Sequence, residues 1–140
     1  MTHKLYLSLG SNLGDRETNI RQALALIDER VGSVYRVSSS IETDPVGFQS
    51  SNKFINVVCL VHTMMSPMAC LRETQKIEKE LGRTQKSIKP DGSLTYKDRL
   101  IDIDLLTYDQ LVLNTPELTL PHPRMHERDF VLIPLREIQE

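Results

Sequence analysis

The spacing of hydrophobic and polar side chains along the chain predicts four main β-strands. Residues 4–9 alternate apolar and polar positions, which places the three leucines of this segment on one face of a strand. Residues 34–43 predict a second strand, and the apolar run at 53–62, rich in β-branched side chains, predicts a central one. Residues 100–109 predict the fourth strand, and residues 110–114 a short fifth.

Two stretches between these strands follow the helical period instead. The apolar positions of the first are Ile20, Ala23, Leu24, Ile27 and Val31. Gly32 ends this pattern. In the second stretch, Ser66 and Pro67 supply an N-cap and a first-turn proline. The side chains that we expect to face inward from this second helix are Cys70, Thr74, Ile77 and Leu81.

The order of the elements, β-α-β-β-α-β, is typical of α+β proteins with the ferredoxin-like fold. In that sandwich two helices pack on one face of an antiparallel sheet, and 140 residues suit a single domain spanning residues 1–140. Polar segments with Pro and Gly lie at 44–52 and 83–99, and the second is long enough to predict a mobile, functional loop. Because this fold hosts many functions, individual side chains must indicate the chemistry.

Charge and apolar content exclude several classes of protein. Seventeen Lys and Arg against nineteen Asp and Glu give a net charge of −2, which provides no broad field for nucleic acid. No stretch approaches the roughly 20 apolar residues that span a bilayer, and the start of the chain does not read as a signal peptide. Cys59 and Cys70 form neither a metal-binding nor a disulfide pattern. We expect a cytoplasmic monomer with no nucleic-acid or membrane partner.

The sharpest chemical feature is a pair of carboxylates, Asp102 and Asp104, inside the fourth predicted strand. Residues two apart on a strand share a face, about 6.6 Å apart along the chain, so the two carboxylates repel each other. A bound cation removes that repulsion, and oxygen ligands without His or Cys favour Mg²⁺. The alternative is a solvated strand face on which the aspartates pair with Lys or Arg.

Basic side chains accompany the acidic pair on both sides in the sequence. Arg83, Lys86, Lys89, Lys97 and Arg99 lie in the long polar loop before it. Arginine stabilises the charge that spreads over a transferred phosphoryl group, although such residues are also common in solvated loops.

After the pair, prolines on both sides hold His122 in place, and Arg128 could bind phosphate through a bidentate fork. A plain loop with a single histidine is the alternative. The turn at residues 9–15 lacks the Gly-rich phosphate-binding patterns, which favours a structural turn. Asn56 is a polar residue inside an apolar strand and needs partners, from the backbone or from a ligand.

Taken in order, these segments resemble the 6-hydroxymethyl-7,8-dihydropterin pyrophosphokinases. The resemblance covers nearly the whole chain: YLSLGSN, ETDPVG, KFIN, the helix end KIEKELGR, the pattern R-x-x-D-I-D-L-L and LPHPRMHERDFVLIPL. It implies an enzyme that transfers the β,γ-diphosphate of ATP to a pterin alcohol in folate biosynthesis, with two Mg²⁺ ions. The open alternatives are another Mg²⁺-dependent phosphotransferase or a non-catalytic ferredoxin-like module that binds a ligand.

The resemblance also implies roles for individual residues. The two metal ligands would be Asp102 and Asp104, and the catalytic arginines would be Arg83 and Arg99. The ATP-binding positions would be Gln75, Glu78, Leu105, Leu118, Thr119, His122 and Arg128. The pterin-binding positions would be Thr43, Val46, Gly47, Phe54, Asn56, Tyr96 and Phe130. The family's usual Trp-Gly-Pro-Arg-Thr stretch reads Tyr-Lys-Asp-Arg-Leu here, at residues 96–100, so Tyr96 would replace Trp as the stacking lid.

Overall fold

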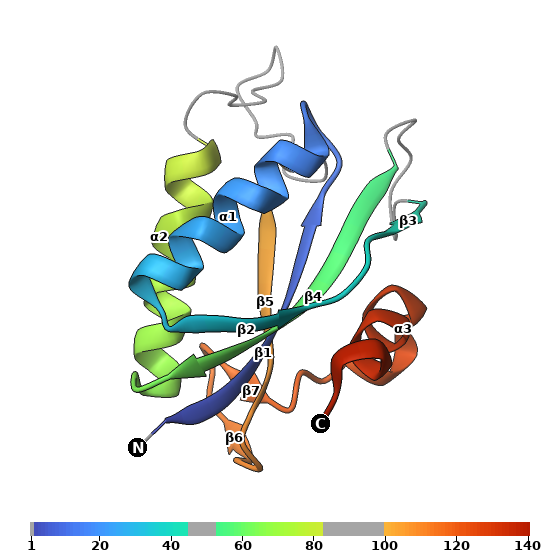
Figure 1. Ribbon diagram of the computed structural model, residues 1–140. Helices are drawn as coiled ribbons and strands as arrows, with labels where there is room; N and C mark the ends of the chain where they lie inside the picture. Colours follow the sequence, from blue (N-terminus) through green and yellow to red (C-terminus); the bar gives the residue numbers. More distant parts are fainter. Residues whose placement is uncertain (1, 45–52, 83–99) are drawn as a thin grey trace.

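The computed structural model describes residues 2–44, 53–82 and 100–140 as an antiparallel sheet between helices (Figure 1). The strands are β1 (His3–Ser11), β2 (Ser33–Val37), β3 (Ile41–Thr43), β4 (Phe54–Thr63), β5 (Asp102–Tyr108), β6 (Leu113–Asn114) and β7 (Thr119–Leu120). The helices are α1 (Arg16–Arg30), α2 (Pro67–Gly82), the 3₁₀-helix η1 (Met125–Glu127) and α3 (Asp129–Ile138). None of the helices in these described ranges is both long and apolar enough to cross a membrane.

The sheet has the strand order expected of the ferredoxin-like fold. Its path is β2-β4-β1-β5, every pairing is antiparallel, and β3 pairs with β4. The crossover from β1 through α1 to β2, and that from β4 through α2 to β5, each skip one strand of this order. The α+β prediction is therefore confirmed.

Two strand predictions differ in detail from the structure. The predicted strand 34–43 is divided into β2 and β3, because Ser38 bonds to β4 through its backbone N–H and its side chain: Ser38 N donates to Val58 O, and Val58 N donates to Ser38 Oγ, both at 2.9 Å. The predicted fifth strand is reduced to β6, which pairs with β7 in a separate two-stranded sheet.

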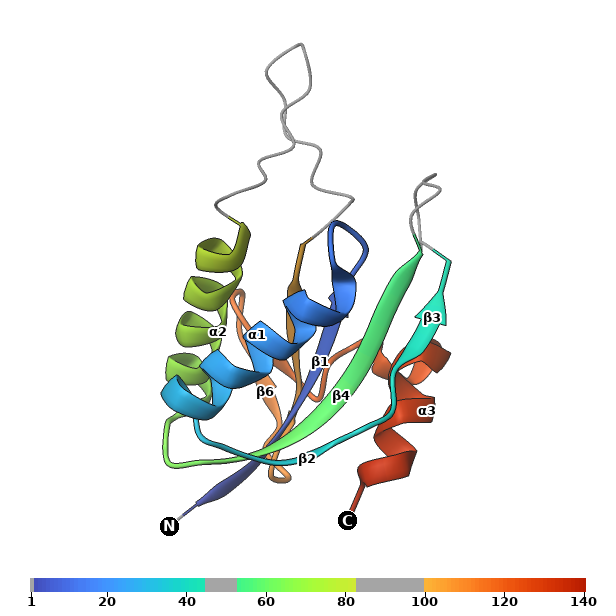
Figure 2. The same ribbon diagram turned by 45° about the horizontal axis from the view of Figure 1, so that its top comes forward.

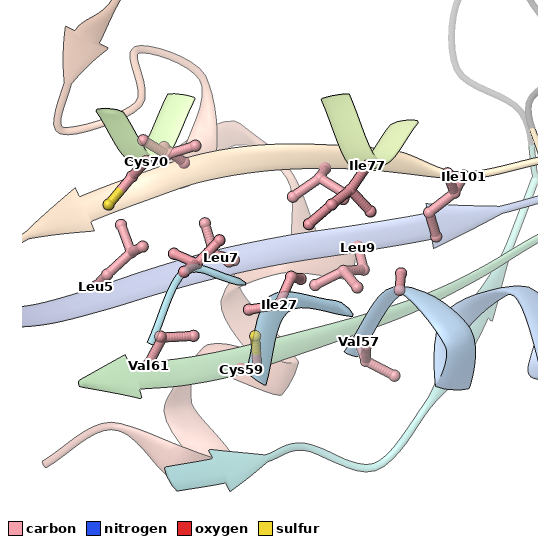
Figure 3. Packing of buried hydrophobic residues seen from close by; sticks show 14 of the residues in the cluster. Leu5, Leu7, Leu9, Ile27, Val57, Cys59, Val61, Cys70, Ile77 and Ile101 are labelled. Carbon is pink, nitrogen blue, oxygen red and sulfur yellow. The ribbon is translucent and has the colours of Figure 1, made fainter. Parts of the chain in front are cut away.

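The two predicted helices begin and pack as their sequences indicate. Asp15 caps α1 by accepting a hydrogen bond from Thr18 N, and Ser66 accepts one from Ala69 N at the start of α2. Their apolar stripes cover one face of the sheet, where Figure 3 shows Ile27, Cys70 and Ile77 against the strand side chains. Leu24 and Leu81, at the margins of the stripes, are only partly buried.

A third helix, α3, covers the opposite face of the sheet and was not predicted. Figures 1 and 2 show it on the other side of the strands from α1 and α2. The second core that it closes consists of Tyr6, Val58, Leu60, Leu106, Met125, Val131, Leu135 and Ile138. This apolar packing ends before the end of the sheet where β1 finishes and β5 begins, and polar side chains occupy that region.

Candidate active site

A row of polar positions crosses three strands at this end of the sheet. Gly10 on β1 pairs with Asn56 of β4 on one side and with Asp102 of β5 on the other, and Ser8 pairs with Asp104. Neighbouring strands lie about 4.8 Å apart, so Asp102 and Asn56 are separated by about 10 Å across the central strand. Acidic and amide-bearing positions thus share one face of the sheet.

The acidic pair has the placement that its spacing predicts. Asp102 and Asp104 are half-buried, whereas Ile103 and Leu105 between and after them are buried in the core below α1 and α2. The alternation puts both carboxylates on the opposite face, toward the α3 side. Within the described part of the chain, no group of three or more His, Cys, Asp or Glu side chains forms a metal cage by itself.

A third carboxylate, Glu78 of α2, lies beside the pair. Its Oε2 accepts a hydrogen bond of 2.8 Å from Ile103 N, the backbone amide between the two aspartates. Burial, together with the negative charges of Asp102 and Asp104, raises the pKa of Glu78 to about 8, even though the bond from Ile103 N acts in the other direction. Without a cation, the surroundings of Glu78 therefore favour its protonated form much more than those of an exposed carboxyl.

A cleft of about 240 Å³ opens next to the acidic pair. Its lining residues are Leu71, Ile103, Asp104, Leu105, Pro116, Glu117, Leu118, Thr119, His122 and Pro123. Four of the predicted ATP-binding positions, those at 105, 118, 119 and 122, are in this set, together with one of the predicted metal ligands. Gln75 is exposed on α2, between Leu71 of the lining and Glu78, on the helix face that these i, i+4 and i+7 positions share.

His122 is held in a defined orientation at the rim of this cleft. Its backbone N–H donates to Leu106 O at 2.8 Å, and its Nδ1 accepts from Arg124 N at 3.2 Å. Burial, assisted by the positive charges of Arg128 and Arg124, lowers the pKa of His122. The neutral ring must then carry its hydrogen on Nε2, since Nδ1 is an acceptor. His122 therefore presents a single N–H donor at Nε2.

Three predicted pterin-binding residues come together on the other side of Gly10. Asn56 is only 4% exposed, and its Nδ2 donates to Thr43 Oγ1 at 2.9 Å. This bond fixes the amide so that Oδ1 lies over Gly10, where a Cβ atom would be 2.9 Å from Asn56 Oδ1 and 3.4 Å from Phe54 Cδ1. Gly10 was missed as a site residue. A glycine inside an alternating strand is the signal that would have indicated close approach of another group.

Phe130 and Arg128 lie at the start of α3 and contact each other. The guanidinium carbon of Arg128 is 5.6 Å from the centroid of the Phe130 ring, in cation–π geometry. Phe130 also packs against the second core. A predicted ATP-binding residue and a predicted pterin-binding residue are therefore in contact.

The remaining predicted site residues fall outside the described residues. They are Arg83, Val46, Gly47, Tyr96 and Arg99. The described site residues form two groups. The first is the cleft with the carboxylates, and the second is the Asn56 amide with the aromatic side chains. Gly10 lies between Asp102 of the first group and Asn56 of the second.

The fold and this end of the sheet define the class of protein: a ferredoxin-like α+β domain with an acidic site beside a small cleft. Comparison with known families is more specific. A family model described as 7,8-dihydro-6-hydroxymethylpterin-pyrophosphokinase (HPPK) matches residues 6–140. The chain belongs to this family.

Individual relatives agree with the family match. A 2-amino-4-hydroxy-6-hydroxymethyldihydropteridine pyrophosphokinase from Porphyromonas gingivalis is 47% identical over 135 residues, covering 96% of this chain and 89% of the relative. One of the same name from Bacillus subtilis is 43% identical over 139 residues, covering 99% and 79%. The crystal structure of wild-type HPPK-DHPS from Plasmodium falciparum has a TM-score of 0.73 at 14% identity, covering 98% of this chain and 41% of that one. This last likeness concerns the fold alone.

Proposed function

We propose that the protein transfers the β,γ-diphosphate of ATP to the hydroxymethyl group of 6-hydroxymethyl-7,8-dihydropterin, releasing AMP, as a step of folate biosynthesis. The observation that carries this proposal is that Gly10 pairs with Asp102 on one neighbouring strand and with Asn56 on the other. A carboxylate suited to a phosphate-bound cation therefore lies close to an amide suited to a heterocycle. A reaction between two bound substrates needs such proximity, because positioning alone can supply a large part of the rate.

ATP would occupy the cleft and extend toward the acidic pair. The apolar Leu105 and Leu118 suit the base, and Thr119 and the Nε2–H of His122 can donate to ribose or phosphate oxygens. Arg128 lies close enough to lower the pKa of His122 and would add a cation on the same side. Gln75 and Glu78 would flank the nucleotide from α2.

The donor set of the acidic pair suits Mg²⁺. Asp102 and Asp104 offer only oxygen atoms and share one face of β5. Two carboxylates are a usual protein contribution to a Mg²⁺ site whose other ligands are substrate phosphates and water. We propose that these aspartates hold two ions with ATP. When bound, Mg²⁺ would neutralise the negative charge of the triphosphate.

The pterin would lie over Gly10 between the aromatic rings. The Asn56 amide presents a donor and an acceptor to the amide-bearing edge of the heterocycle, and Thr43 fixes which of its atoms faces Gly10. Phe54 and Phe130 supply flat apolar faces for stacking. Because Gly10 lies between Asn56 and Asp102, a pterin bound at this position would direct its hydroxymethyl group toward the acidic pair.

The chemical step forms one bond and breaks one. The hydroxymethyl oxygen attacks the β-phosphorus of ATP in line, and the bond from that phosphorus to the oxygen bridging the α-phosphorus breaks. AMP leaves with the bridging oxygen, and the hydroxyl proton passes to solvent. We infer catalysis by positioning and charge stabilisation without a covalent protein intermediate, with Arg83 and Arg99 as cations for the transferred group and Tyr96 as a lid.

A coupled assay for AMP release, with and without the pterin, tests this function. We expect AMP to appear only when ATP, Mg²⁺ and 6-hydroxymethyl-7,8-dihydropterin are all present, in a 1:1 ratio to pterin diphosphate determined by mass spectrometry. AMP release at an equal rate without pterin would indicate a nucleotide hydrolase. No AMP release with all components present would exclude the proposed transfer.

The monomeric state and the cytoplasmic location predicted from the sequence belong to the same proposal. Both cysteines, Cys59 and Cys70, are buried free thiols, as a reducing compartment permits. Analytical ultracentrifugation of the purified protein would test the oligomeric state, with a single species of about 16.0 kDa expected.

A further inference from the structure

We propose that Arg16, a residue outside the predicted site, is a positioning residue for the pterin side. The inference rests on the proposed function, since it concerns how that substrate is recognised. One nitrogen of Arg16, Nη1, donates both to Glu42 Oε2 at 2.9 Å and to Lys53 O at 2.8 Å. Glu42 is in β3, and Lys53 directly precedes β4.

The turn that precedes Arg16 is fixed by its own hydrogen bonds. The Asn19 amide donates to Ser11 Oγ at 3.2 Å and to Leu13 O at 2.8 Å, and Gly14 takes a positive φ of 65°. Asp15 then caps α1, so Arg16 occupies the first helical position. The predicted structural role of this turn agrees with these contacts. The turn therefore fixes the position of Arg16 relative to the end of β1, where Gly10 lies.

The two contacts of Arg16 lie on either side of the pair that forms the pterin site. Thr43 pairs with Phe54, Glu42 immediately precedes Thr43, and Lys53 immediately precedes Phe54. By bonding to both, Arg16 holds the end of β3 against the start of β4. Thr43 Oγ1 in turn accepts from Asn56 Nδ2, so the placement of β3 determines the orientation of the recognising amide.

The strand β3 depends on such a contact because it is short. It has only three residues, each paired with β4 alone. The ion pair between Arg16 and Glu42 is partly exposed, with side-chain exposures of 32% and 50%, and exposed pairs add little to global stability. The consequence of losing Arg16 should therefore be a displaced Thr43 and Asn56 in a protein that remains folded.

The experiment compares Arg16→Gln and Arg16→Lys with the matched control Arg21→Gln. Arg21 is an exposed arginine on the same helix; its Nη2 donates to Thr18 Oγ1 at 3.2 Å, and its charge also acts on the Asp15 carboxylate. The measurements are pterin affinity in the presence of a non-hydrolysable ATP analogue, ATP-analogue affinity alone, steady-state kcat and KM for each substrate, and the thermal unfolding midpoint.

For Arg16→Gln we expect the pterin Kd and KM to rise about 5- to 30-fold, the effect of losing hydrogen bonds from a charged donor. The Kd of the ATP analogue and the kcat at saturating pterin should stay within about twofold, since the acidic pair is on the other side of Gly10. Arg16→Lys keeps one cationic nitrogen that can donate to both acceptors, but on a side chain of different length and shape, so its effect should be intermediate. Arg21→Gln should match the wild type.

Three results would overturn the proposal. The first is an unchanged pterin Kd in Arg16→Gln. The second is an equal loss for both substrates, and the third is an affinity loss that Arg21→Gln reproduces. The assay on the wild-type protein keeps the two proposals apart: failure of pterin-dependent AMP release there rejects the function, whereas an active wild type with an unaffected Arg16→Gln variant rejects only the role of Arg16.

Discussion

Gly10→Ala is expected to weaken pterin binding strongly while leaving the protein folded. The added Cβ would lie 2.9 Å from Asn56 Oδ1, closer than such contacts allow, and 3.4 Å from Phe54 Cδ1, which is tight but tolerable. The atom that must move is the far end of a side chain. Asn56 can rotate away, but rotation breaks its bond to Thr43 Oγ1 and turns the amide from the position proposed to recognise the pterin.

The effect on stability should be small because two contributions oppose each other. Gly10 is not among the positive-φ residues, so alanine fits its strand backbone. Alanine also lowers the conformational entropy of the unfolded chain, which stabilises the folded protein by about 0.4–1 kcal/mol. Losing the bond between Asn56 and Thr43 costs about 0.5–1.5 kcal/mol. The net change lies within about 1 kcal/mol, which shifts the Tm of a domain of this size by about 4 °C or less.

The effect on binding should be larger. Displacing Asn56 removes its hydrogen bonds to the pterin and crowds the ring, which we expect to cost about 1–3 kcal/mol, or about 5- to 150-fold in Kd. Calorimetric titration with pterin and with an ATP analogue, together with thermal unfolding, measures each quantity. Gly32→Ala is a useful comparison, because its Cβ would collide with His62 O and lie 2.8 Å from Thr63 Cα, backbone atoms that cannot rotate away. That variant should lose stability instead.

Pterin binding by Gly10→Ala as tight as that of the wild type would contradict the proposed role of Asn56. An equal fall in ATP binding would also contradict it, because the alanine would then disturb the whole end of the sheet. A large loss of Tm, comparable to that of Gly32→Ala, would show that Asn56 cannot move and that Gly10 is needed for the fold itself.

Variants at three further positions test the acidic pair, the histidine and the third carboxylate. Asp104→Asn should lower turnover by about 100-fold or more with an unchanged Tm, measured as AMP release over a Mg²⁺ titration; full activity would reject the metal assignment. His122→Gln keeps an N–H donor near the position of Nε2 whereas His122→Asn does not, so the ATP KM should rise less in the Gln variant, by about threefold against about tenfold; the reverse order would contradict the assigned tautomer. For Glu78, the folded-state pKa of about 8 lies above the unfolded value of 4.5, so its stabilising contribution is complete below pH 4.5 and is lost as the pH rises to about 8. In denaturant unfolding with a chelator present, Glu78→Gln should therefore gain stability relative to the wild type from pH 5 to pH 8, and a constant difference would contradict the raised pKa.

The order of strands and helices could be predicted because its signals are local. The alternation at Leu5, Leu7 and Leu9 and the cap at Ser66 depend on residues a few positions apart, and the structure confirms them. The same holds for the common face of Asp102 and Asp104, which follows from the period of a strand alone.

Helix α3 was missed because its local signals oppose its tertiary packing. Pro134 lies inside the helix and lacks the N–H that an interior position donates. Local sequence therefore favours a loop. Val131, Leu135 and Ile138 bury their side chains on the sheet, and this burial offsets the proline.

The most informative features of the site depend on how the strands pair and how the helices pack on them, which local sequence patterns do not reveal. The contact of Gly10 with Asn56 requires β1 and β4 to pair at one position, and the bond from Ile103 N to Glu78 requires α2 to lie along β5. Sequence analysis identified Asn56 as a residue in need of partners. Only the pairing of β3 with β4 identifies Thr43 as one of them.

The contacts along the outer side of β5 have a consequence for self-association. This strand is the last in the sheet path, and an open border of a sheet is a template onto which another chain can add a strand. Here Glu78 takes up the Ile103 amide, and the backbone of His122 takes up the Leu106 carbonyl. Two elements of the candidate site thus also block strand addition. Variants of Glu78 that cannot accept a hydrogen bond should aggregate more readily on heating, even where their monomers remain as stable as the wild type.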